Sequence, residues 1–240
     1  MCSLRYAVAV PALVGAVTIS ACSSAPVVSD PVPRPITEPT SSEGEYAELT
    51  SGTESDDGLF MVHRTDGELY FEIPDSLLDT DMLLISRVSG VQAGMGGFLP
   101  AGAAVNRQMV RFERADDRVL LRKYSGEAVA DDTLAIALSV ESNYFAPILG
   151  SFDIEVRTPS DDASVIEVTD FFEGDTPAIS GLRPAQRRSY QVRRLDGSRS
   201  FIGQVRSYPL NVNVRHTLTY DAGNPPSDEQ ANTVSMERQS

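Results

Sequence analysis

The stretch GLFMVHRTDGELYFEIP, residues 58–74, decides the fold of this chain of 240 residues. Two apolar runs flank the pair Asp66 and Gly67, and in the second run every other residue from Leu69 to Ile73 is apolar. Asp-Gly between two such runs is a strong signal of a β-hairpin, because glycine adopts without strain the positive φ that a tight turn requires. The pattern therefore predicts two antiparallel strands, with the second ending at Pro74.

Further turns and strands extend this hairpin. We expect Asp75 to cap a short turn over residues 76–78, and Met82 to Ile85 to form a third strand that is buried on both faces or nearly so. Periodicity predicts three strand pairs and one helix, namely residues 108–113 with 119–122, 152–156 with 165–168, 201–208 with 212–220, and a helix over 131–140. The expected fold of residues 58–222 is mainly β in the α+β class, with antiparallel hairpins that form a sandwich or a curved sheet and one or two short helices.

The amino terminus has the pattern of a targeting segment. Arg5 precedes an apolar run from Tyr6 to Ile19, as in a secretory signal peptide. The run ends in Ile-Ser-Ala-Cys22, which resembles the lipobox of bacterial lipoproteins, in which the cysteine becomes the acylated first residue of the mature chain. We therefore expect a lipoprotein signal peptide over residues 1–21 and lipidation at Cys22; an ordinary cleaved signal is the alternative. Ser23 after the cysteine resembles the pattern of lipoproteins sent to the outer membrane, which implies a lipid-anchored protein of the cell envelope on the periplasmic side.

Residues 22–57 are rich in proline, serine, threonine and acidic residues. Such a composition buries too little apolar surface to offset the entropy of ordering, so we expect an extended acidic tether, with a brief helical turn near Tyr46 and Leu49. The whole chain has 20 basic and 34 acidic residues, and loss of residues 1–21 removes only Arg5, which leaves 19 − 34 = −15. This charge argues against nucleic acid as a partner.

The candidate catalytic residues do not form a known constellation. The chain has two histidines, His63 and His216, both in predicted strands, and it has no His-Glu-x-x-His motif. A zinc site would need a further donor, such as Glu72 or Asp221, and whether the two histidines meet in space is left open. The sequence also lacks a Gly-x-Ser-x-Gly elbow, and its acids are too evenly spread to single out a catalytic pair. We assign no catalytic and no metal-binding residue.

Two other stretches allow more than one interpretation. Residues 90–98 are rich in glycine, but they lack the Lys-Ser or Lys-Thr of a phosphate-binding loop, so a surface loop is favoured. From Arg183 to Arg199 the chain carries six arginines and one acid, Asp196. This stretch could be a solvated connector whose arginines pair with nearby acids, or it could bind the acidic tether, a lipid head group or a second domain.

The last residues have the pattern of a linker followed by the start of another strand. Residues 223–232 have the composition of a linker, and Thr233 to Met236 has the composition of a strand. Because no partner for that strand is evident in the sequence, we expect residues 223–240 to be a linker and the truncated start of a next segment. This suggests a fragment.

Seven segments, in order, resemble the amino-terminal region of a family of large bacterial zinc-dependent metalloproteases. They are residues 58–64, 69–75, 82–87, 106–113, 143–148, 190–201 and 213–220. Members of that family are secreted or lipid-anchored and carry their His-Glu-x-x-His domain after this region. The resemblance implies a non-catalytic region that supports or covers the catalytic domain, with that domain as partner. It also implies no cofactor in this chain, zinc beyond Ser240, and no activity of the chain alone. The alternative is a stand-alone envelope lipoprotein that acts as a binding or scaffolding module.

Overall fold

The computed structural model describes residues 41–95, 100–124, 145–180, 182–227 and 232–240. The expected signal peptide, Cys22, the tether up to residue 40 and the expected helix over residues 131–140 lie outside the described residues. No helix among the described residues is both long and apolar enough to cross a membrane.

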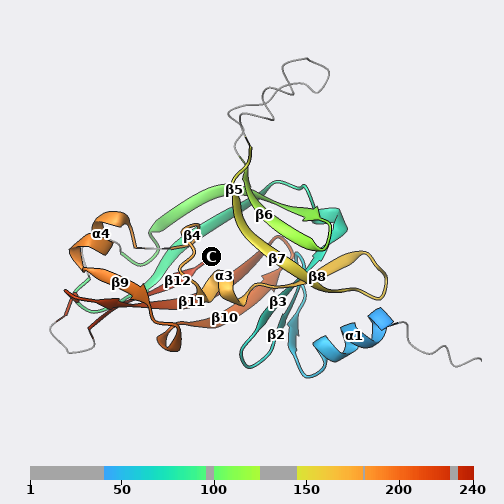
Figure 1. Ribbon diagram of the computed structural model, residues 1–240, viewed down its shortest axis with the longest axis horizontal. Coiled ribbons are helices and arrows are strands. Elements are labelled where there is room, and N and C mark those ends of the chain that lie inside the picture. Colours follow the sequence, from blue (N-terminus) through green and yellow to red (C-terminus); the bar gives the residue numbers. More distant parts are fainter. Residues whose placement is uncertain (1–40, 96–99, 125–144, 181, 228–231) are drawn as a thin grey trace, which may run out of the picture. The chain divides into compact units, whose positions relative to one another are not determined.

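The described strands form one antiparallel sheet of twelve strands, which confirms the expected β-rich α+β fold (Figure 1). The strands are β1 (Glu54–Asp56), β2 (Met61–Arg64), β3 (Leu69–Pro74), β4 (Met82–Val91), β5 (Ala104–Ala115), β6 (Arg118–Tyr124), β7 (Ile148–Arg157), β8 (Ala163–Glu167), β9 (Val192–Leu195), β10 (Phe201–Tyr208), β11 (Asn211–Ala222) and β12 (Thr233–Gln239). Their order in the sheet is β1-β2-β3-β8-β7-β6-β5-β4-β12-β11-β10, and β9 pairs with β11 off this path. The described helices are α1 (Ser41–Thr50), α3 (Thr169–Glu173) and α4 (Pro184–Ser189), with short 3-10 turns at Asp75–Leu77 and Gly197–Arg199.

The first hairpin is confirmed, but for a different reason than expected. β2 and β3 pair antiparallel with Arg64 opposite Leu69. Gly67 is not in the left-handed region of φ. The turn is held instead by Thr65, whose hydroxyl accepts hydrogen bonds from the backbone N–H groups of Gly67 at 3.4 Å and of Glu68 at 3.0 Å. A hydroxyl that bonds its own turn in this way replaces the conformational freedom of glycine.

The other three predicted pairs are also confirmed, as β5–β6, β7–β8 and β10–β11. Asp116 takes a positive φ of 53° in the tight turn between β5 and β6. β4 differs from its prediction, because Leu83 is 55% exposed and the strand is therefore not buried on both faces. Asp75 does not cap the following turn with its side chain, which binds Arg157 instead.

The sheet curls so that its two ends approach each other. The backbone N–H of Leu59 donates to the carbonyl of Tyr208 at 2.7 Å, and the hydroxyl of Ser207 donates to the carbonyl of Phe60 at 2.8 Å. The Arg64 guanidinium, from β2, donates to the carbonyls of Ile202 and Gly203 in β10. The described strands therefore form a single curved, open sheet whose two ends are linked by these bonds.

The inner face of the sheet carries two apolar clusters. The larger one contains Phe60, Phe71, Phe112, Val119, Phe152 and Ile166 and is covered by Phe171 and Phe172 of α3, and the smaller one contains Val88, Leu218, Tyr220, Val234 and Met236. Buried polar residues also face inward. Gln108 donates to the carbonyl of Ala178 at 3.2 Å, and Ser86 to the carbonyl of Ile179 at 3.2 Å.

Residues 41–57 are folded. The helical turn expected near Tyr46 and Leu49 is confirmed as part of α1, but the prediction of an extended tether is wrong for this segment. α1 lies against β7, and the Tyr46 hydroxyl donates to Glu72 of β3 at 2.8 Å. β1 pairs with β2, with Ser55 opposite His63. The acidic composition did not indicate that this segment is ordered, because contacts with residues far away in the sequence order it, and not its own apolar content.

The carboxyl-terminal strand is also part of the sheet. β12 lies between β11 and β4, with Met236 opposite both Leu218 and Val91, and Met236 is 1% exposed. The expectation of a strand start without a partner is therefore wrong. Its partners were not evident because one of them, β4, precedes it by more than a hundred residues.

Candidate functional site

An apolar pocket of about 480 Å³ opens inside the curl of the sheet. Its floor is made by the larger apolar cluster, through aromatic and aliphatic side chains of Phe60, Phe112, Leu121, Phe152, Phe171 and Phe172. β4, β5 and β11 form its walls with Leu84, Val110 and Val214. A concave apolar site of this size, with few polar groups, is the usual form of a small-molecule pocket.

Exposed leucines and a few polar groups also line this pocket. Leu83 is 55% and Leu210 is 88% exposed, and both are lining residues. The polar lining residues are Thr80, Asp81, Asn211 and Ser240. The Asp81 carboxylate accepts a hydrogen bond from Arg111 Nε at 2.6 Å, and the Arg111 guanidinium lies 3.6 Å from the centroid of the Tyr124 ring.

His63 lies on the outer face of the sheet in a chain of hydrogen bonds. Its Nδ1 is 2.7 Å from the Ser55 hydroxyl, and its Nε2 is 3.1 Å from Glu72 Oε2, which also accepts a bond from the Tyr46 hydroxyl. The bond from His63, followed by the bond from Tyr46, lowers the pKa of Glu72. Burial, together with the nearby Glu72 carboxylate, raises the pKa of Tyr46 to about 12. This network joins α1 and β1 to the first hairpin.

His216 lies on the inner face, opposite Arg238 in the β11–β12 ladder. His216 is 0% and Arg238 is 1% exposed. Burial, and then the charge of Arg238, lower the pKa of His216 to about 4. Burial lowers the pKa of Arg238 to about 10. Among the described residues, neither ring nitrogen of His216 has a hydrogen-bond partner, and neither do Nε and Nη1 of Arg238.

The structure therefore does not bring the two histidines together. They point to opposite faces of the sheet and have no hydrogen-bond partner in common within the part of the chain that the structure describes. Glu72, which was considered as a third zinc donor, binds His63 and Tyr46, whereas Asp221 binds Arg194 and Arg199. In the described ranges no group of three His, Cys, Asp or Glu residues is placed to hold a metal ion.

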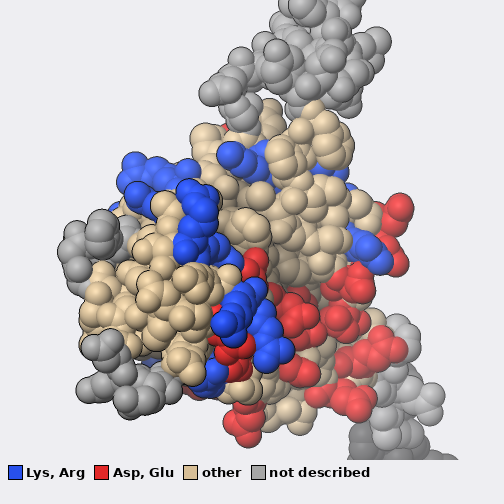
Figure 2. All heavy atoms as spheres, turned by 60° about the vertical axis from the view of Figure 1, so that its left-hand side comes forward, with Lys and Arg blue, Asp and Glu red and all other residues tan. Residues whose placement is uncertain are grey.

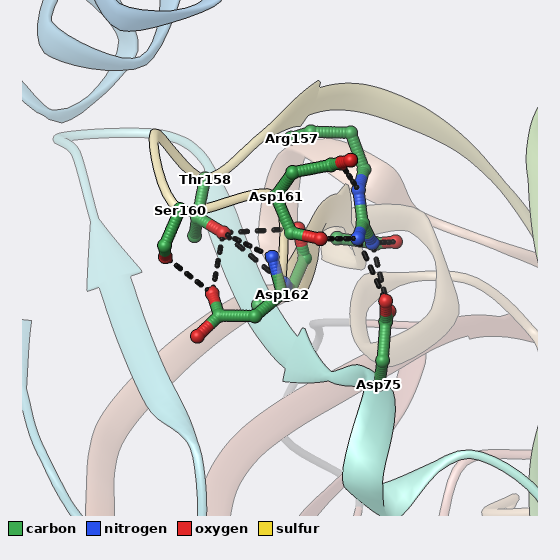
Figure 3. A network of polar contacts seen from close by, with 8 residues as sticks. Asp75, Arg157, Thr158, Ser160, Asp161 and Asp162 are labelled. Carbon is green, nitrogen blue, oxygen red and sulfur yellow. Dashed lines mark hydrogen bonds and ion pairs between the residues drawn. The ribbon is translucent and has the colours of Figure 1, made fainter.

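A second polar network, around Arg157, joins the end of β3 to the β7–β8 turn (Figure 3). The guanidinium makes two bonds to the Asp75 carboxylate, at 2.7 and 2.8 Å, and one to Asp161 at 2.7 Å. These bonds lower the pKa of Asp75. The turn is tightened by the Thr158 hydroxyl, which donates to Asp162 at 2.9 Å. Planar bidentate pairing of this kind fixes geometry as well as charge.

The arginines between 183 and 199 lie on a surface of mixed charge. Figure 2, which brings the α4 and β9 side forward, shows basic side chains gathered beside an acidic region. Arg187 pairs with Asp175, Arg194 with Asp221, and Arg199 with Asp196 and Asp221. Asp175 and Asp221 lie outside residues 183–199, so a count of acids within this stretch missed them. For these three arginines, pairing with nearby acids is what the connector interpretation expects.

Sequence reasoning missed the pocket and the role of Arg157. The pocket is lined by side chains from many separate segments, and the sequence shows only that each of these segments has an apolar face. The strand pair 152–156 with 165–168 was expected, but nothing in the local sequence pairs Arg157 with Asp75, which lies 82 residues earlier. The Gly90 to Phe98 loop is described only up to Met95, which is buried in the smaller apolar cluster.

Two family models match the chain. Residues 102–240, more than half of the chain, match the family described as domain of unknown function DUF5117, and residues 43–91 match the one described as domain of unknown function DUF5118. Neither a curated protein nor a solved structure matches the chain. The two matched segments share one sheet, because β4 of the first lies between β5 and β12 of the second.

Proposed function

The chain belongs to the family described as domain of unknown function DUF5117, and from this premise we propose that it is the non-catalytic amino-terminal region of a zinc metalloprotease of the bacterial cell envelope. In this proposal the curved sheet supports or covers a catalytic domain that carries the His-Glu-x-x-His motif and the zinc ion. The chain itself contributes no catalytic residue and no metal ligand.

One observation carries this proposal. Three polar residues in the segments that resemble the metalloprotease family, Arg64, Asn106 and Gln108, use their side chains to bind backbone carbonyls of other parts of the chain. Arg64 of β2, near one end of the sheet, donates to backbone carbonyls of β10 at the other end. Asn106 and Gln108 both donate to the carbonyl of Ala178. Side chains that are occupied in this way are suited to a rigid support and not to chemistry on a substrate.

The interleaved strands also support a single platform. β4 pairs with β5 and β12, and β3 pairs with β8, so the DUF5118 segment cannot fold as a sheet apart from the DUF5117 segment without losing these pairs. Long-range pairing of this kind gives one cooperative unit. A rigid unit is what a neighbouring domain needs as a support.

The second candidate is a stand-alone lipid-anchored binding module. The open apolar pocket with its exposed leucines favours this function, because a passive support does not require such a hollow. The two candidates differ in what the gene encodes beyond codon 240. An in-frame His-Glu-x-x-His motif there favours the first, and its absence favours the second.

A protease assay on two proteins tests the proposal. We expect the chain alone, with added zinc, to cleave no casein, and the longer gene product to cleave casein in a zinc-dependent manner. We also expect the chain, added in trans to a separately produced catalytic domain, to raise the melting temperature of that domain, with an unrelated acidic protein as control. Zinc-dependent cleavage by the chain alone, or no effect of the chain on the catalytic domain, contradicts the proposal.

Attachment to the membrane is proposed separately, through acylation of Cys22. Each buried methylene adds about 0.8 kcal/mol of membrane affinity, so several acyl chains on one cysteine hold a protein firmly. We expect Cys22→Ala to release the protein from the membrane fraction of the producing cells. Sedimentation of this variant with the membranes, at the level of the unchanged chain, contradicts the anchor.

A further inference from the structure

The interior of the pocket is suited to an apolar occupant. Protein cores are packed densely, and an unfilled apolar volume of about 480 Å³ leaves its lining without contacts on one side. Water gains little at the floor of the pocket, because it finds few hydrogen-bond partners among phenylalanine, leucine and valine side chains. An aliphatic group would therefore be favoured over water at this position.

An exposed leucine points to the same kind of ligand independently of the volume. Leu210, in the turn between β10 and β11, lines the pocket and is 88% exposed. Leu83 of β4 lies opposite Met109 in the β4–β5 ladder, so its side chain points to the outer face of the sheet. Leu210 would extend the apolar contact of a chain that enters the pocket from solvent.

The charge of the lining restricts the polar end of the ligand. Among the described lining residues the one charged side chain is Asp81, a carboxylate that Arg111 already pairs. Thr80 and Asn211 add uncharged hydrogen-bonding groups, whereas the Ser240 hydroxyl is already bonded to Ser86. No lysine, arginine or histidine is among these lining residues. A carboxylate or phosphate head would therefore find no cation in the lining, whereas a hydroxyl would find partners.

From these three features we propose that the pocket binds the aliphatic chain of a single-chain amphiphile with an uncharged, hydrogen-bonding head. The chain lies against the phenylalanine floor, and the head stays near Thr80 and Asn211. This inference goes beyond the proposed function and does not rest on it, because it concerns the described chain alone and holds with or without a catalytic domain.

Displacement of a fluorescent apolar probe, N-phenyl-1-naphthylamine, from the mature chain tests the inference. Straight-chain 1-alkanols are expected to displace the probe with an affinity that rises about fourfold per methylene, the factor given by about 0.8 kcal/mol per buried CH₂, until the pocket is full. Decanol is expected to bind at least tenfold more tightly than decanoate at neutral pH. Affinity that does not depend on chain length, or tighter binding of decanoate, overturns the proposal.

Two adjacent residues of β5 provide a matched pair of variants. Val110 points into the pocket and Met109, which is 41% exposed, points to the outer face. Val110→Phe is expected to fill the pocket and weaken alkanol binding at least tenfold, and Met109→Phe to leave it unchanged. Equal binding by both variants overturns the proposal.

A surface variant keeps the test decisive where Val110→Phe does not fold. Leu210→Ser changes a side chain that is 88% exposed, so folding is expected to be unaffected. We expect it to weaken binding of the longest alkanols about threefold or more, with little effect on the shortest ones. Unchanged binding of the longest alkanols by this variant, with circular dichroism like that of the unchanged chain, places the ligand elsewhere and overturns the proposal.

Discussion

Two arginines of this protein, Arg157, which is partly buried, and Arg238, which is fully buried, have opposite surroundings. Arg157 on β7 has a carboxylate on two sides and a hydroxyl on a third, and its contacts join two separate parts of the sheet. Arg238 on β12 is 1% exposed and faces His216, with only the Met236 sulfur as a hydrogen-bond partner, at 3.0 Å, among the described residues. The first guanidinium has exchanged water for ionic partners. The second has lost water with little in return, so burial alone does not show that a charge stabilises a fold.

The largest expected effect concerns the neighbour of the unpaired arginine. The folded pKa of His216, about 4, lies below its ordinary value of 6.5, so the unfolded chain binds more protons between these two values. Stability should therefore be complete above pH 6.5 and fall as the pH decreases towards 4, by about 3 kcal/mol for this group. Urea unfolding at several pH values measures the loss. In His216→Phe this loss of stability between pH 6.5 and pH 4 should be absent. A loss as large as that of the unchanged chain would mean that His216 does not cause it.

Arg157→Met should give the next largest effect. The change leaves Asp75 and Asp161 without their shared cation, and the expected cost is about 2 kcal/mol, less than for a fully buried pair because Asp75 is 39% exposed. The folded pKa of Asp75 is lowered, so its part of this stability is present above its unfolded pKa and is lost as the pH falls through the folded one. Urea unfolding at pH 7 and at pH 3 measures both parts. A variant as stable as the unchanged chain at pH 7 contradicts the role of this network.

Arg238→Met is the same substitution in the other region, and the sign should be reversed. It replaces an unpaired buried charge by an apolar side chain of similar length beside Met236, which should stabilise the fold by about 1 kcal/mol. It also removes a positive charge next to His216, so the pKa of His216 should rise. Urea unfolding measures the change in stability, and NMR titration of the imidazole measures the pKa of His216. A loss of stability comparable to that of Arg157→Met would mean that Arg238 has a partner.

The difference between the two regions also shows what the sequence can predict. The four hairpins could be predicted because each one pairs neighbouring segments, and alternation with turn residues is a local signal. The positions of β12 and α1 could not, since they depend on contacts between residues far apart in the sequence: Met236 pairs with Val91, and Tyr46 binds Glu72. Cys22 stays a prediction, outside the described residues. The pocket could not be predicted either, because it exists only where the curl brings separate apolar faces together.

The smallest expected effect is that of Tyr46→Phe, which concerns the segment that composition assigned to a tether. The change removes the hydroxyl that donates to Glu72 but keeps the ring, whose centroid lies 6.3 Å from that of His63. One hydrogen bond between partly buried groups contributes about 1 kcal/mol, so the global stability should fall by that much or less. Hydrogen exchange should show a larger local change, because the amides of α1 lose protection when the helix is held less firmly. Amides of residues 42–50 that exchange as fast as in an unfolded chain, with or without the substitution, would mean that this segment is a tether after all.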